Sequence, residues 1–258
     1  MAGEAVHQWI LVLDVENFSS RRDPVQRRVR AAMYRVLTTA LARAGLQRGA
    51  VVMEDRGDGV LMLVDAAVPP VLIAGPFVRE LDEQLREYQE QSNDEHAVRL
   101  RVALHQGLAA RDEHGWSGDA VNTACRLVDA QPLRDVLAAA PSARLVFAVS
   151  GELHHAVVRH GHRGVDPAAY LPLDFTTKHG ETISSWVTVP GCPAPPGLPT
   201  STPASPATNT ASPSPATGTT PPATSPRPTV HQRARTVQGD QIAGDKHVTV
   251  HTTGSVRP

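Results

Sequence analysis

Residues 8–18, QWILVLDVENF, are a mostly apolar run that ends in acidic residues. Such a run is typical of a central strand that reaches a functional edge of its sheet. Residues 50–65, AVVMEDRGDGVLMLVD, place two β-rich segments on either side of RGDG, which favours a hairpin turn. Together, the two stretches predict a β-sheet with acidic side chains at one edge.

The neighbouring segments alternate between helical and strand patterns. Residues 24–45 repeat apolar side chains at three- and four-residue spacing, and residues 69–91 show a second helical pattern. Further strands are expected at 98–110, 143–150 and 182–190, and further helices at 117–130 and 151–161. The β-α-β-β-α-β order, with additions, predicts an α+β, ferredoxin-like sheet with helices on one face.

Composition narrows the class of protein. The 258 residues carry a formal net charge of −1, which argues against binding to nucleic acid or to an acidic membrane. Two cysteines are too few for a disulfide framework, and the sequence shows no signal peptide or membrane span. A cytoplasmic protein is therefore expected.

The C-terminal part has a different composition. Residues 191–229 consist mainly of Pro, Thr, Ser and Ala and have one charged residue, Arg227, which predicts a disordered linker after a domain at 1–190. Residues 230–258 regain β-branched residues. They are either a disordered end or a short β-prone segment that binds a protein partner or copies of itself, and the second interpretation is slightly favoured.

Four side chains suggest the chemistry. Asp14 ends the first strand and Asp58 lies at the hairpin tip, while Asn122 and Arg126 are four residues apart on one helix face. Two carboxylates at neighbouring strand ends suit hard divalent cations, and an arginine stabilises charge on a transferring phosphoryl group. Gly57 allows the backbone to approach a phosphate closely. Nucleotide chemistry is indicated, but the spacing alone selects no particular reaction.

Four motifs carry a resemblance to a known family. The sequence resembles class III nucleotidyl (adenylate/guanylate) cyclases, most of all divergent cyclase-homology proteins of actinobacteria. The motifs are LVLDVENFS (11–19), VMEDRGDGVLMLV (52–64), LRVALHQG (100–107) and GWSGDAVNTACRLVDA (115–130). A weaker match covers 178–189, and the resemblance says nothing about the tail. It implies a cyclase-type βααββαβ sheet.

The resemblance also implies a reaction and roles. A homodimer would convert a nucleoside triphosphate into a 3′,5′-cyclic nucleotide by two-metal catalysis. Asp14 and Asp58 would hold two Mg²⁺ or Mn²⁺ ions, facing Asn122, which orients the ribose, and Arg126, which meets the α-phosphate, of the second chain. The late phosphate-binding lysine of the family corresponds to Lys178 or, with a one-residue shift, to His179.

Base selection is implied by Glu54, because a glutamate at this position of the family accompanies guanine. GTP is therefore the favoured substrate. Two positions depart from the family pattern: Gly115 stands at the second base-reading position, and Arg56 replaces an apolar residue. These departures support an alternative, a catalytically degenerate nucleotide-binding or scaffold protein of a signalling or defence system.

Overall fold

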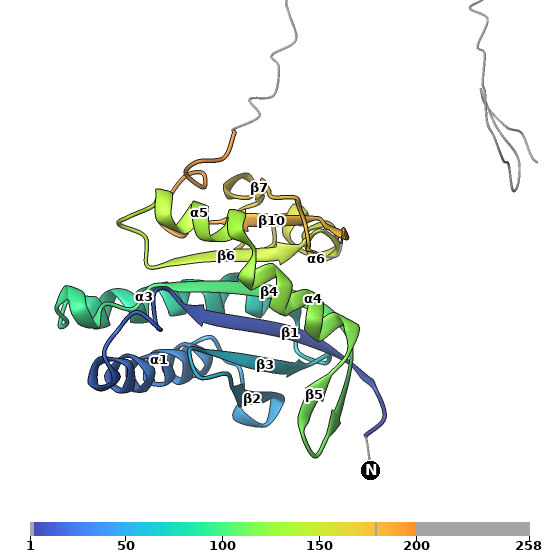
Figure 1. Ribbon diagram of the computed structural model, residues 1–258. Coiled ribbons are helices and arrows are strands. Elements are labelled where there is room, and N and C mark those ends of the chain that lie inside the picture. Colours follow the sequence, from blue (N-terminus) through green and yellow to red (C-terminus); the bar gives the residue numbers. More distant parts are fainter. Residues whose placement is uncertain (1–2, 179, 200–258) are drawn as a thin grey trace, which may run out of the picture. The chain divides into compact units, whose positions relative to one another are not determined.

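The computed structural model describes residues 3–178 and 180–199 (Figure 1). The strands are β1 (Val6–Val15), β2 (Val51–Asp55), β3 (Gly59–Asp65), β4 (Leu100–Asp112), β5 (Gly115–Ser117), β6 (Leu145–Ser150), β7 (Leu171–Pro172), β8 (Phe175–Thr176), β9 (Thr182–Ile183) and β10 (Ser185–Thr188). The α-helices are α1 (Asp23–Arg43), α2 (Pro70–Leu72), α3 (Val78–Gln89), α4 (Asp119–Asp129), α5 (Gln131–Ala139) and α6 (Gly151–Ala156). Most of the predicted linker and the whole segment 230–258 lie outside the described residues.

One sheet organises the described chain, with the strand order β2-β3-β1-β4-β6-β10-β7 and with β5 paired to β4. The long first strand lies between β3 and β4 and is antiparallel to both, whereas β4 and β6 are parallel (Figure 1). The predicted α+β sheet is confirmed. The βααββαβ order is wrong in detail, because a single α-helix, α1, connects β1 to the β2–β3 hairpin.

Helices cover both faces of the sheet. Leu11 and Leu13 of β1 belong to a buried cluster with α1 and α3, whereas Ile10 and Val12 belong to a second cluster with α4 and α5. Side chains along a strand point alternately to opposite faces, so an apolar run such as Ile10–Leu13 needs cover on both sides. The prediction of helices on one face is therefore wrong.

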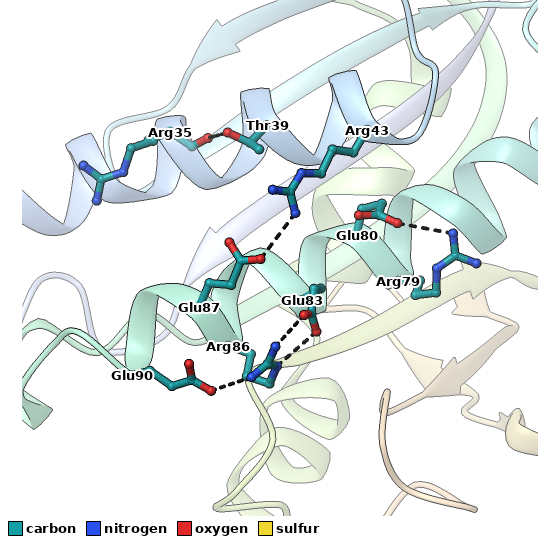
Figure 2. A network of polar contacts seen from close by, with 9 residues as sticks. All are labelled: Arg35, Thr39, Arg43, Arg79, Glu80, Glu83, Arg86, Glu87 and Glu90. Atoms are coloured by element: carbon teal, nitrogen blue, oxygen red, sulfur yellow. Dashed lines mark hydrogen bonds and ion pairs between the residues drawn. The ribbon is translucent and has the colours of Figure 1, made fainter.

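Charged side chains connect α1 and α3 at the surface (Figure 2). Arg43 of α1 contacts Glu87 of α3 at 3.3 Å, and Arg86 bridges Glu83 and Glu90 within α3. All five side chains are more than two-fifths exposed, and such pairs contribute about 0–1 kcal/mol each. The two helices are therefore held together mainly by their buried apolar side chains.

His105 on β4 introduces a pH dependence into the fold. Its side chain is buried and, among the described residues, its Nδ1 has no hydrogen-bond partner. Burial lowers the pKa of His105, and the carboxylates of Glu152 and Asp119 only partly oppose this effect. The folded protein therefore holds this imidazole neutral at pH values where the unfolded chain takes up a proton.

We expect the free energy of unfolding to fall as the pH decreases below about 6.5, by up to about 1.4 kcal/mol per pH unit from this group. The sign follows because the unfolded state binds more protons than the folded state. Urea unfolding of wild type and His105→Gln at pH 8 and pH 5.5 measures the effect, which the variant should lose. His114→Gln, at an exposed position, should keep the wild-type slope; equal slopes in all three proteins would contradict the expectation.

Candidate active site

The first two predicted residues lie at one corner of the sheet. Asp14 of β1 pairs across the sheet with Gly59 of β3, and the backbone N–H of Val15 donates to the carbonyl oxygen of Asp58 at 3.0 Å. A Cβ atom at Gly59 would overlap the carbonyl oxygen of Leu13, so only glycine permits this close approach. The fold therefore brings the backbone segments that carry Asp14 and Asp58 together.

Asp14 already has a cationic partner. Arg101, its cross-strand neighbour on β4, donates from Nη2 to Asp14 Oδ2. The side chains of Arg101 and Asp14 are only 7% and 14% exposed, and burial lowers the pKa of Arg101. The sequence analysis does not predict this ion pair, although Arg101 lies in the LRVALHQG motif. The pair could have been predicted only from the register of β1 and β4, which places Asp14 opposite Arg101.

Asp58 is exposed at the edge of a groove of about 900 Å³ between the β2–β3 turn and α1. Its lining includes Arg27, Arg30, Tyr34, Arg56, Gly57 and Asp58. Gly57 has a φ of +85° and donates its N–H to the carboxylate of Asp55, which defines the turn that carries Asp58. Arg30 pairs with Asp55 and lies over the ring of Tyr34. Arg30 and Arg56 are already paired with Asp55 and Glu54, and Arg27 adds a further guanidinium that suits an anionic ligand.

The second set of predicted residues lines another groove, of about 1110 Å³. The apolar face of α4 is buried against the sheet, which leaves Asn122 and Arg126 on the opposite side, where they line this groove with Lys178. Arg126 donates to Glu181 at 2.7 Å, but these side chains are 35% and 49% exposed. Such a pair contributes about 0–1 kcal/mol, so it does not prevent Arg126 from binding a ligand.

Glu54 is held by other parts of the chain. Its Oε2 accepts the backbone N–H of Trp116 at 3.2 Å, and its Oε1 lies 3.1 Å from Nη2 of Arg56. Glu54 lines neither of the two grooves described above. The structure therefore separates the predicted residues into a carboxylate corner, an Asn-Arg-Lys groove and an engaged glutamate; His179 lies outside the described residues.

The oxygen ligands at the carboxylate corner fit a hard divalent cation in chemistry. The Asp58 side chain is exposed at the groove. On Asp14, Arg101 donates to Oδ2, and the second carboxylate oxygen, Oδ1, remains as a potential metal ligand. Within residues 3–178 and 180–199, no cluster of three or more His, Cys, Asp or Glu side chains could hold a metal ion. Asp58 lines the groove and Asp14 does not, and two carboxylates are fewer ligands than a site closed by protein groups alone needs.

Solved structures with a similar fold include cyclases. They include an adenylate/guanylate cyclase/hydrolase from Silicibacter pomeroyi (20% identity, TM-score 0.53, 74% of this chain and 99% of that chain). A guanylyl cyclase (16%, 0.51, 73% and 94%) and a guanylate cyclase domain from Catenaria anguillulae in complex with GTP (16%, 0.50, 73% and 97%) are also similar. No protein-family profile and no curated protein sequence matches the chain significantly.

These likenesses establish the class of fold. The chain has the fold of an adenylate/guanylate cyclase domain, as the four sequence motifs predicted, and it spans nearly the whole length of the similar chains. At 16–20% identity the likeness defines the fold alone. In the part of the chain that the structure describes, no helix combines the length and hydrophobicity needed to span a bilayer.

Proposed function

We propose that this protein is a nucleotidyl cyclase that acts as a homodimer on a nucleoside triphosphate and forms a 3′,5′-cyclic nucleotide and diphosphate. The observation that carries the proposal is that Gly57 and Asp58 line one groove while Asn122, Arg126 and Lys178 line another, and that the two grooves share no lining residue. Head-to-tail pairing of two copies would place the Asp58 groove of one opposite the Arg126 groove of the other. The Asp58 groove would then supply the carboxylate for a metal ion, and the Arg126 groove would supply the donors for the ribose and the phosphates.

In the proposed site, Asp58 and Asp14 would hold the two divalent ions, with the Oδ1 atom of Asp14 available beside the oxygen that accepts from Arg101. When bound, the ions lower the pKa of the ribose hydroxyl and neutralise charge on the leaving diphosphate. Asn122 hydrogen-bonds the ribose and orients its 3′-hydroxyl towards the α-phosphorus. Arg126 donates to the α-phosphate oxygens, where negative charge develops, and Lys178 binds the outer phosphates. The Arg27 side chain of the Asp58 groove adds positive charge for the polyphosphate.

The alternative is a nucleotide-binding protein without turnover. The observation in its favour is the ion pair between Asp14 and Arg101, because this guanidinium occupies one carboxylate oxygen that a second metal ion would use. Calorimetric binding of a nucleotide, together with the absence of any cyclic product from ATP, GTP, CTP or UTP, would support this alternative over a cyclase.

Mixing of two inactive variants tests the shared site. Asp58→Ala removes the metal half and Arg126→Ala removes the phosphate half, so each homodimer should form little cyclic product in the presence of Mn²⁺. An equimolar mixture should recover up to about a quarter of wild-type turnover, because half of the dimers are mixed and each has one intact site.

Two controls accompany this experiment. Asp58→Ala mixed with Asp58→Asn should show no recovery, since neither chain supplies the carboxylate. Sedimentation velocity confirms that the mixed chains associate. Product formation by a strictly monomeric wild-type protein, or associated mixtures with no recovery, would reject the shared site.

A further inference from the structure

We infer that Arg56 and Gly115, the two departures from the expected motif pattern, act together to hold Glu54 and thereby suppress selection for guanine. This inference rests on the proposed function and concerns the substrate class of the same site: Glu54 itself lines neither groove, but its partner Arg56 lines the Asp58 groove. The sequence alone pointed to a preference for GTP through Glu54, and the structure supplies a reason to expect otherwise.

The carboxylate of Glu54 has a partner on each oxygen. Trp116 contributes its backbone N–H to Oε2 at 3.2 Å, and Arg56 places Nη2 3.1 Å from Oε1. Guanine recognition by a carboxylate uses these same oxygens, which accept from the N1–H and N2–H groups of the base. A carboxylate oxygen can accept more than one hydrogen bond, but a neutral guanine base competes for Oε1 with the charged guanidinium of Arg56, which is the stronger donor.

Gly115 permits this arrangement. It begins β5 with a φ of +127°, and a Cβ atom at this position would lie 2.7 Å from Glu54 Oε2. Any other side chain at residue 115 would push the carboxylate away from the Trp116 N–H. The glycine that reads no base therefore has a role in packing, since it makes the space in which Glu54 is held.

Arg56 changes the chemistry presented to the base. The guanidinium has five N–H donors and no acceptor, so the pair presents donors where a free glutamate would present acceptors. Every nucleobase has a carbonyl oxygen or ring nitrogen that accepts a hydrogen bond. We therefore expect the wild-type protein to bind ATP, GTP, CTP and UTP with affinities within about fivefold of one another.

Removal of Arg56 should restore the discrimination. In Arg56→Leu, the Oε1 atom of Glu54 loses its cationic partner and becomes free to accept from guanine. We expect the ratio of GTP to ATP affinity to rise about tenfold over wild type, as a good base contact is worth about one to two orders of magnitude. Arg56 is 42% exposed in the ion pair, so the substitution leaves the core intact.

The measurement is calorimetric binding of the four nucleoside triphosphates with Mg²⁺ to the full chain. Glu54→Gln in the Arg56→Leu background must abolish the gain, because the amide no longer offers two acceptor oxygens. Arg79→Leu, which breaks a surface pair with Glu80 outside both grooves, should behave as wild type.

The possible results distinguish a failure of this inference from a failure of the proposed function. Nucleotide binding with a wild-type GTP preference, or with a ratio that Arg56→Leu leaves unchanged, overturns the inference and leaves the proposed function in place. A gain that persists in the Glu54→Gln background also overturns it. No binding of any nucleotide by any variant overturns the proposed function and this inference with it.

Discussion

Arg101→Leu is expected to lower the free energy of unfolding by about 3–5 kcal/mol, measured by urea denaturation at pH 7 with a metal chelator present. The substitution leaves the Asp14 carboxylate, which is only 14% exposed, without its cation. Removal of one partner from a buried pair is costly because the remaining charge is neither solvated nor neutralised.

A double variant and a control variant separate the effect of the uncompensated charge on stability from the effect of altered packing. Arg101→Leu combined with Asp14→Leu should recover much of the loss, since no uncompensated charge remains. Arg79→Leu breaks an exposed pair and should change stability by no more than about 0.5 kcal/mol. A loss of less than about 1 kcal/mol in Arg101→Leu, or no recovery in the double variant, would contradict an ion pair that compensates a buried charge.

Arg101→Leu also tests whether Asp14 binds a metal ion. If Asp14 contributes to a cation site, Mg²⁺ should stabilise Arg101→Leu more than wild type, because the ion then supplies the missing positive charge. Addition of Asp58→Asn should reduce that stabilisation. Equal responses to Mg²⁺ in all three proteins would exclude the carboxylate corner as a site for the ion.

Arg126→Ala is expected to reduce cyclic-nucleotide formation by about 10²–10³-fold, with nucleotide binding changed much less. The guanidinium is placed to stabilise charge that develops mainly in the transition state, so turnover should fall rather than affinity. Stability should change by no more than about 1 kcal/mol, because the pair with Glu181 is exposed.

Arg126→Lys should recover little activity, since an ammonium group cannot reproduce the bidentate geometry. Arg134→Ala removes a neighbouring arginine that lines the same groove and pairs with Asp129, and it should cost less than tenfold. Comparable losses in Arg126→Ala and Arg134→Ala would show that the groove contributes general positive charge and not a positioned donor.

The local elements of the fold were accessible from the sequence. The three- and four-residue spacing in 24–45 predicted α1, and the β-rich segments around RGDG predicted β2 and β3. Periodicity and turn chemistry act over a few residues, so they can be recognised without knowledge of the partner. The cover on the second face was not predicted, because an apolar run does not state which helix packs against it.

The sequence predicts where the candidate residues lie in the fold, and the structure adds contacts that the sequence does not predict. The corner of Asp14 and Asp58 and the shared groove of Asn122 and Arg126 follow from positions at strand ends and on one helix face. The partners Arg101 and Glu181 are 87 and 55 residues away along the chain from Asp14 and Arg126. No local pattern connects such pairs.

By itself, the sequence determined most of the longer strands and helices, the cyclase-type α+β sheet that they build, and which polar side chains stand at the ends of those elements. Only the tertiary structure decided that α5 packs beside α4, that Asp14 pairs with Arg101, that Glu54 is held by Trp116 and Arg56, and that Asp58 and Arg126 line different grooves. The physical reason is range: periodicity and turns are encoded by neighbours in the chain, whereas the charge and hydrogen bonding of a side chain depend on whichever strand or turn folds against it.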